Sequence, residues 1–291
     1  MRLVTFTHAG STRIGVQVDG QVVDLAAAAP ELPREMCAFL AAGQRALDAA
    51  RAATENGRAR LGAGEVRIGA PILRPPKILA VGLNYADHVR ETGREAPKVP
   101  MIFNKQSTAV TGSGAPVHVP RVSDKVDWEG ELAFVIGRRC RHVPRDRAAS
   151  VIAGYTIVND VSVRDWQHRV PTFTMGKSFD THCPLGPAIV TADEVGDPHA
   201  LDLRTWVNDD LRQSSNTREL IFDCFYLVEH LSTVFTLEPG DVVSTGTPSG
   251  VGAAMNPPTF LKAGDTVRVV IDKLGELRNP VIAEPADTAQ F

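Results

Sequence analysis

Apolar residues at the start of the chain fall in short runs that polar turn residues separate. Residues 3–6, 14–18 and 21–25 form three such runs. The Asp19-Gly20 pair between the second run and the third is a typical hairpin turn. We therefore predict short strands over these three ranges.

The pattern then changes to an alanine-rich stretch over residues 34–58, which has the composition of a helix and is interrupted at Gly43. Three prolines within residues 71–76 follow and predict a linker. We therefore predict a small N-terminal α+β domain over residues 1–70 and a second domain over residues 71–291.

Short β-branched runs alternate with Gly and Pro turns in the second domain, a pattern typical of a β-rich fold with few helices. These runs cover residues 77–83, 132–137, 154–160, 188–191, 241–247 and 266–272. We predict one short helix after Asn84, with Asn84 as its N-cap and Asp87 in its first turn. A second helix is predicted over residues 217–233, where apolar residues form a wide stripe. The expected fold class is α+β and β-rich.

The composition narrows the class of protein. Of 291 residues, 43% are hydrophobic, and 31 basic residues against 34 acidic residues give a net charge of −3, so a disordered chain is excluded. Basic residues are scattered, which argues against nucleic acid as a partner. No apolar run reaches the roughly 18–20 residues of a membrane span, and no apolar signal core opens the chain. The four cysteines lack a CxxC pair. We expect a soluble cytoplasmic enzyme.

The stretch VDWEGELAFVIG over residues 126–137 carries the first candidate chemistry. If it is a strand, its period of two puts Glu129 and Glu131 on one face and Trp128, Leu132 and Phe134 on the other. Neighbouring carboxylates resist burial unless a cation neutralises them. Taken alone, the stretch fits either a solvated acidic face or a metal site.

A second stretch, GYTIVNDVSVRDWQ, places Asp160 at the end of an apolar strand. Glu129, Glu131 and Asp160 together would make a hard, all-oxygen ligand set. Such a set suits Mg²⁺ or Mn²⁺, whereas zinc prefers His or Cys ligands, and these stretches contain neither. We therefore predict that the three carboxylates converge on one cation site.

His88 and Glu91 lie three residues apart and so share one face of a helical turn. A carboxylate beside an imidazole fixes the tautomer of the ring and raises its basicity, as a general base requires. A surface pair without function is the alternative. Lys177 and the glycine-rich loop over residues 245–252 are further candidates, as a cation and as an anion-binding backbone.

Several motifs occur in one order along residues 72–282, and together they resemble the fumarylacetoacetate hydrolase superfamily. They are NYADH-xx-E, VDWEGEL, GYTIVNDVSVRDWQ, GKSFDTHCPLGP, RQSSNT, LEPGDVVSTGTPSGVG and FLKAGD. The resemblance implies a catalytic domain built as a β-sandwich-like roll, a homodimer, and a divalent metal, commonly Mg²⁺ or Mn²⁺, with Ca²⁺ possible in crystals.

By motif position, the resemblance also implies roles for single residues. Glu129, Glu131 and Asp160 match the metal ligands, and His88 with Glu91 matches the pair that activates water. Three residues match groups that stabilise a developing oxyanion or enolate, namely Lys177, Arg164 and Gln167. Thr247 matches a substrate-carboxylate contact. Residues 84–98 match a segment that often closes as a lid, and their polar composition predicts mobility without substrate.

The predicted substrate is a small 2-oxo acid, and three reactions fit the predicted site. The first is hydrolysis of a C–C bond in a β-diketo acid of the acylpyruvate or fumarylpyruvate type, through a metal-bound enolate. The others are decarboxylation of oxaloacetate and keto–enol isomerisation of a hydroxymuconate-like diacid. The His88–Glu91 pair favours hydrolysis, since it supplies a base for water.

Overall fold

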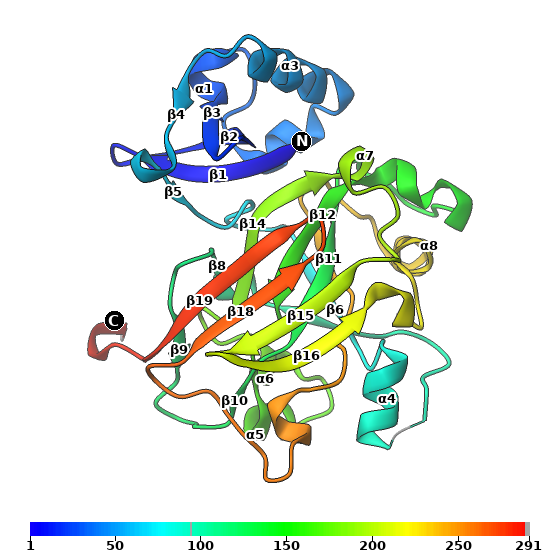
Figure 1. The fold of residues 1–291 in the computed structure, drawn as a ribbon. Coiled ribbons are helices and arrows are strands. Elements are labelled where there is room, and N and C mark those ends of the chain that lie inside the picture. Colours follow the sequence, from blue (N-terminus) through cyan, green and yellow to red (C-terminus); the bar gives the residue numbers. More distant parts are fainter. Residues whose placement is uncertain (94, 289–291) are drawn as a thin grey trace.

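A computed structural model describes residues 1–93 and 95–288, and it has the predicted α+β, strand-rich fold (Figure 1). The elements of the N-terminal part are β1 (Arg2–His8), β2 (Ser11–Val18), β3 (Gln21–Asp24), α1 (Leu25–Ala28), α2 (Met36–Ala41), α3 (Gln44–Glu55), β4 (Arg60–Leu61) and β5 (Arg67–Ile68). Within the described residues, no helix is both long and apolar enough to span a membrane.

The predicted N-terminal strands and the helical stretch are present, with shifted boundaries. The strands predicted over residues 3–6 and 14–18 are longer, since β1 covers Arg2–His8 and β2 covers Ser11–Val18. The third strand ends at Asp24 rather than at residue 25, because the Asp24 side chain accepts a hydrogen bond from the Ala26 backbone N–H and begins α1. The helical stretch is interrupted at Gly43, as predicted. Its φ of +66° is accessible to glycine at little strain, and it separates α2 from α3.

The rest of the chain is dominated by strands, with short helices at their ends. Its strands are β6 (Ile78–Gly82), β7 (Met101–Lys105), β8 (Val110–Thr111), β9 (Val117–Val119), β10 (Val126–Asp127), β11 (Gly130–Ile136), β12 (Ile152–Asn159), β13 (Ser162–Val163), β14 (Cys183–Thr191), β15 (Asp202–Val207), β16 (Asp210–Asn216), β17 (Val242–Ser244), β18 (Thr266–Ile271) and β19 (Gly275–Ala283). Its helices are α4 (Ala86–Thr92), α5 (Arg164–Gln167), α6 (Thr174–Lys177), α7 (Ala192–Val195) and α8 (Cys224–Val234).

Two sheets pack face to face to form the core. The larger sheet has the order β4-β3-β2-β1-β14-β12-β11-β17-β6-β7, and the smaller one has the order β16-β15-β18-β19-β9. Apolar residues of both sheets form one buried cluster, in which Phe134 of the larger sheet and Val269 of the smaller one take part. Trp128 and Leu132 belong to the same cluster, on the side predicted from the period of two.

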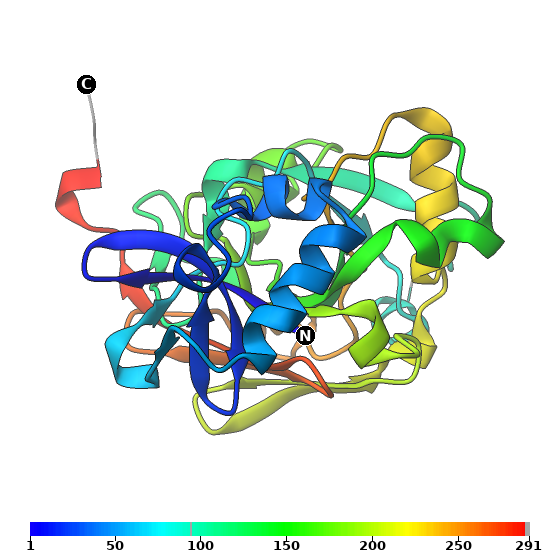
Figure 2. The same ribbon diagram turned by 90° about the horizontal axis from the view of Figure 1, so that it is seen from above.

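The N-terminal part joins the larger sheet through β1, which pairs antiparallel with β14 at Arg2↔Val190 and Leu3↔Ile189. In the view from above, α3 lies across the top of the molecule (Figure 2). Because hydrogen bonds of one sheet cross the predicted boundary near residue 70, the division into two domains stays a prediction.

Two helix starts were wrong. The helix expected from residue 217 begins at Cys224, capped by Asp223, and residues 217–219 form a separate short 3-10 turn. Asn84 does not cap α4, because its side chain instead bonds the Phe222 backbone N–H and the Thr245 carbonyl. Tyr85 occupies the N-cap position. Asp223 gives α8 a local cap, whereas at Asn84 a tertiary contact outweighs the local signal.

Candidate active site

Three carboxylates meet at the ends of two neighbouring strands. Glu131 lies on β11, Glu129 just before it, and Asp160 just after β12. The register pairs Gly130 with Asn159, and the Asp160 N–H donates to the Glu129 carbonyl at 2.8 Å, which holds the two strand ends together. Carboxylate oxygens of the three residues lie within 4.8 Å of one another. All three side chains are buried.

The predicted strand over residues 126–137 is broken between β10 and β11, so Trp128 and Glu129 lie outside regular structure. Because of this break the Glu129 N–H has no partner in the strand ladder, and it donates instead to the Asn159 side-chain oxygen at 3.0 Å. Glu129 and Glu131 nevertheless face the same cavity, as the pattern predicts.

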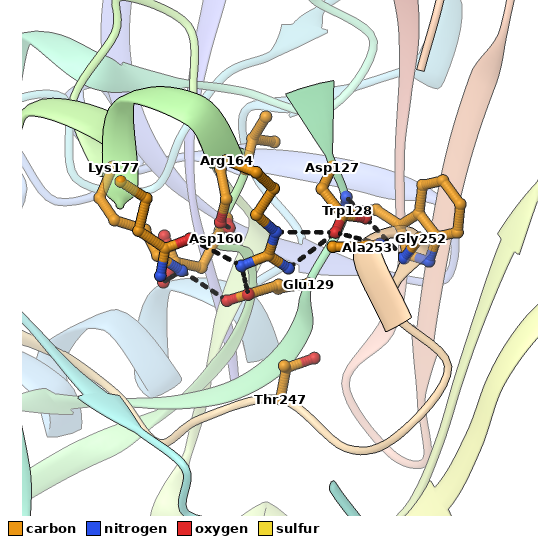
Figure 3. Close-up of polar contacts among 12 residues, drawn as sticks. Asp127, Trp128, Glu129, Asp160, Arg164, Lys177, Thr247, Gly252 and Ala253 are labelled. Carbon is orange, nitrogen blue, oxygen red and sulfur yellow. Dashed lines mark hydrogen bonds and ion pairs between the residues drawn. The ribbon is translucent and has the colours of Figure 1, made fainter. Parts of the chain in front are cut away.

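Buried cations offset part of the negative charge of this cluster. The Lys177 Nζ atom lies 2.6 Å from Glu129 Oε2 and 2.8 Å from Asp160 Oδ2 (Figure 3). Burial alone raises the pKa of the Glu129 carboxyl, but Lys177 and Arg164 outweigh this effect and lower that pKa to about 2.

Glu131 has the opposite environment, because no cation contacts its carboxylate among the described residues. Burial, and then the charges of Asp160 and Glu129, raise the pKa of Glu131 well above its ordinary value. Its Oε2 atom accepts hydrogen bonds from Ser244 Oγ at 2.6 Å and from the Gly246 N–H at 2.9 Å. These two bonds hold the carboxylate in place without neutralising it.

The donor set fits a hard divalent cation. Three buried carboxylates so close together repel one another, and a divalent ion coordinated by oxygen removes that repulsion. Glu129, Glu131 and Asp160 are the residues that could hold Mg²⁺ or Mn²⁺.

Lys105, at the end of β7, is a site residue that the sequence did not single out. Its fully buried Nζ atom lies 2.6 Å from Asp160 Oδ1, and it also donates to the carbonyls of Val161 and Lys177. The one available signal was a lysine closing an apolar strand. Lys105 orients Asp160 and balances its charge.

Replacing Lys105 by methionine is expected to lower the free energy of unfolding by about 3–5 kcal/mol, because a buried carboxylate and two carbonyls lose a partner. Urea unfolding measures this change. Lys125→Met is the matched control, since Lys125 forms an exposed pair with Asp124 and its loss should change the free energy by about 0–1 kcal/mol. Equal effects of the two substitutions would contradict the role of Lys105.

His88 and Glu91 form the predicted pair on α4. His88 Nδ1 lies 2.9 Å from Glu91 Oε2, and Glu91 Oε1 accepts the Gly250 N–H at 2.8 Å. Within the described residues His88 Nε2 has no hydrogen-bond partner. If Nδ1 carries the proton that Glu91 accepts, Nε2 keeps its lone pair and can act as a base.

Arg164, Gln167 and Thr247 also lie at the cavity, but each is held by the protein. Arg164 Nη1 bonds Glu129 Oε1 at 2.8 Å and Gln167 Oε1 at 2.9 Å. The Thr247 hydroxyl accepts a hydrogen bond from Gln213 Nε2 at 2.7 Å and donates to the Gly130 carbonyl at 3.0 Å. Gln213, which lies in the RQSSNT motif but was assigned no role from the sequence, therefore orients Thr247.

One cavity of about 410 Å³ brings the predicted site residues together. Its wall includes His88, Glu91, Glu129, Glu131, Arg164, Gln167, Lys177 and Thr247. Asp160 does not line the cavity. It lies behind Lys177, which lines the cavity and donates a hydrogen bond to Asp160. Apolar residues cover another side, namely Met101, Phe103, Phe173 and Val251. This volume suits a small organic acid rather than a polymer.

The predicted lid over residues 84–98 includes residue 94, which lies outside the described residues. In the described part, Asp87 Oδ2 accepts a hydrogen bond from Ser215 Oγ at 2.6 Å, and Glu91 holds Gly250. Both contacts keep α4 beside the cavity. The mobility of the segment stays a prediction.

Most of the chain matches a known protein family and a curated relative. Residues 77–282 match the family model described as fumarylacetoacetate (FAA) hydrolase, C-terminal. A curated relative in Xenopus laevis, named mitochondrial oxaloacetate tautomerase, is 45% identical over 97% of this chain and 90% of its own length.

Solved structures of similar fold carry names from more than one reaction class. Maleylpyruvate hydrolase from Sphingobium sp. SYK-6, in complex with manganese(II) and pyruvate, has a TM-score of 0.82 and 35% identity, with 98% of this chain and 100% of that chain covered. A 5-carboxymethyl-2-hydroxymuconate delta-isomerase from Mycobacterium smegmatis has a TM-score of 0.79 and 38% identity, with the same coverage.

Proposed function

This chain belongs to the fumarylacetoacetate hydrolase superfamily, and from that premise we propose that it is a metal-dependent keto–enol tautomerase of a small 2-oxo diacid such as oxaloacetate. The observation that carries the proposal is the His88–Glu91 pair, which shares one cavity with the three buried carboxylates. The name of the Xenopus laevis relative supports oxaloacetate as the substrate.

The chain's own residues supply the proton transfer that this reaction needs. His88 Nε2 takes a proton from the carbon next to the keto group, while Glu91 holds the Nδ1–H and stabilises the imidazolium that forms. The imidazolium then gives this proton to the enolate oxygen, which completes the enol. In the reverse direction Nε2 takes the O–H proton and returns it to the carbon, so one base that reaches both atoms is sufficient for tautomerisation.

Negative charge develops on the keto oxygen as the enol forms, and the site is suited to stabilise it. Lys177 and Arg164 supply fixed positive charge in a buried setting, where electrostatic effects are strong. A divalent cation held by Glu129, Glu131 and Asp160 would act as a Lewis acid toward the substrate oxygens. The maleylpyruvate hydrolase structure with manganese(II) and pyruvate supports such a cation.

Hydrolysis of a C–C bond in an acylpyruvate, the reaction favoured from the sequence, is the second candidate. It uses the same base to activate water, and the names of structural relatives include a hydrolase. The cavity volume allows both a small diacid and a water molecule. The homodimer and the cytoplasmic location remain predictions, whichever of the two reactions the protein catalyses.

A turnover comparison with Mn²⁺ or Mg²⁺ separates the candidates. Enol-rich oxaloacetate diluted into buffer is followed by the ultraviolet absorbance of the enol, and pyruvate formation is followed in parallel to detect decarboxylation. Acetylpyruvate, fumarylpyruvate and a hydroxymuconate are tested at equal concentration. We expect the protein to accelerate the loss of the oxaloacetate enol more than it accelerates any of the other reactions tested. Cleavage of an acylpyruvate without acceleration of tautomerisation would overturn the proposal in favour of a hydrolase.

A further inference from the structure

Asp127 is a fully buried carboxylate that the sequence pattern did not single out (Figure 3). Its Oδ1 atom accepts hydrogen bonds from the backbone N–H groups of Trp128 at 2.8 Å and Gly252 at 2.7 Å. Its Oδ2 atom accepts the Ala253 N–H at 2.9 Å and both Nε and Nη2 of Arg164 at 2.8 Å. One carboxylate thus joins an arginine to a distant backbone turn.

The contact with Asp127 decides how Arg164 faces the cavity. A guanidinium carries five N–H hydrogens. Nε and Nη2 each give one to Asp127, and Nη1 gives its two to Glu129 and Gln167. One Nη2 hydrogen has no partner in residues 1–93 and 95–288. Arg164 can therefore offer a ligand a single, directed donor.

The turn bonded to Asp127 forms the neighbouring wall of the same cavity, through Val251, Ala253 and Ala254. A Cβ atom at Gly252 would lie 2.0 Å from the Thr259 carbonyl oxygen and 2.8 Å from Asp127 Oδ1. Only glycine allows the turn to approach the carboxylate this closely. The position of the wall therefore depends on the contact between the turn and Asp127.

We propose that Asp127 is a positioning residue that sets the substrate-binding end of the cavity. It fixes Arg164 and the 251–254 wall relative to each other, so that a substrate carboxylate oxygen meets one N–H donor beside an apolar surface. The inference rests on the proposed function, in that the ligand is a small 2-oxo acid. A charged hydrogen bond held in place ahead of binding gains affinity, because the binding step does not have to order it.

Hydrogen–deuterium exchange tests the first half of the inference on the protein alone. Asp127→Asn replaces one carboxylate oxygen by an NH2 group, which cannot accept the hydrogen bonds that this oxygen takes from Arg164 or from the turn. Exchange in a peptide covering residues 250–256 is therefore expected to be at least about tenfold faster. Asp24→Asn is the matched control. Asp24 is also buried, pairs with Arg13 at 2.6 Å and caps a helix, but it lies in the N-terminal part. Unchanged exchange at 250–256 in Asp127→Asn would overturn the inference.

Ligand binding tests the second half. Oxalate, which has the shape and charge of the pyruvate enolate, is titrated into Mn²⁺-loaded protein by calorimetry. Asp127→Asn is expected to weaken oxalate binding and raise the KM for oxaloacetate, each about 10- to 100-fold. We expect kcat to change less than KM, because the base, Lys177 and the metal ligands remain and Arg164 keeps its charge beside Glu129. Asp24→Asn should leave both affinities unchanged.

Gly252→Ala reaches the same contact from the side of the turn, and it decides the matter if Asp127→Asn does not fold. It is expected to raise KM and weaken oxalate binding in the same direction. Oxalate affinity equal to wild type in the folded variants, or no oxalate binding by wild type, would overturn the inference. Failure of the wild type to tautomerise oxaloacetate would instead overturn the proposed function, while exchange and oxalate binding still report on Asp127.

Discussion

Replacing Glu131 by glutamine is expected to lower turnover strongly and yet to stabilise the metal-free protein. Glutamine keeps the shape of the side chain and an oxygen that can accept the bonds from Ser244 and Gly246. It removes one of three carboxylates of the metal site. Because Lewis-acid stabilisation is worth several kcal/mol, we expect activity to fall roughly 10²–10⁴-fold and Mn²⁺ affinity to fall with it.

The stability effect of Glu131→Gln has the opposite sign. Burial and the nearby Asp160 and Glu129 raise the pKa of Glu131 in the folded, metal-free protein. Because the folded pKa of Glu131 is raised, the protein has its full stability at pH values below the unfolded pKa of this group. It loses stability as the pH rises through the folded pKa. Glutamine does not titrate, so the variant avoids this loss. Its advantage is expected to grow with rising pH and to vanish in acid.

Thermal unfolding in the presence of a chelator measures this advantage. Each unit by which the folded pKa exceeds the unfolded one corresponds to about 1.4 kcal/mol, or roughly 2–4 °C or more in Tm for a chain of this size. Glu276→Ala, which removes an exposed partner of Arg268, is the control for activity and stability. A less stable metal-free Glu131→Gln protein would contradict the conclusion that burial, Asp160 and Glu129 destabilise an ionised Glu131.

Replacing His88 by alanine is the second change with a large expected effect. Loss of a positioned base should lower tautomerisation, and any acylpyruvate hydrolysis, by roughly 10²–10⁴-fold. Decarboxylation of oxaloacetate should fall much less, because it needs charge stabilisation from Lys177 and the metal rather than a base. Both rates are measured on the same preparation, together with Mn²⁺ affinity, which should not change.

Arg90→Ala is the matched control for His88→Ala, since Arg90 lies on the same helix and forms an exposed pair with Glu219. Glu91→Gln should give a smaller loss than His88→Ala, because the imidazole remains and only its orientation and basicity change. Equal losses of tautomerisation and decarboxylation in His88→Ala would show that the residue acts on a step common to both reactions.

The cluster of three carboxylates could be predicted because part of the information is local. Period-two spacing puts Glu129 and Glu131 on one face, and an apolar run ending at Asp160 puts a carboxylate at a strand end. What the spacing could not show was that β11 and β12 are neighbours, since strand order depends on the whole sheet. Spacing alone leaves open whether the three carboxylates belong to one site. The resemblance to the fumarylacetoacetate hydrolase superfamily indicated that they do.

The residues that sequence reasoning missed act through long-range contacts. Lys105 and Asp127 each pair with residues that are distant along the chain, and neither burial nor partner can be read from its neighbours. Asn84 shows the same limit for structure, because its bonds to residues 138 and 161 positions away replaced the expected cap. Local propensity is outweighed wherever a buried polar group finds a tertiary partner.

The pairing of β1 with β14 has a consequence for synthesis of the protein on the ribosome. Leu3 pairs with Ile189, so the first strand made has to wait until nearly two-thirds of the chain has emerged. At ordinary elongation rates this delay is roughly 10–40 s. β5 pairs only with Phe6 and Thr7, so until then this edge of β1 has no neighbour at Arg2 and Leu3 and can pair there with another nascent chain. Yield in a cell therefore depends on how well that edge is protected during translation, independently of the stability of the finished sheet.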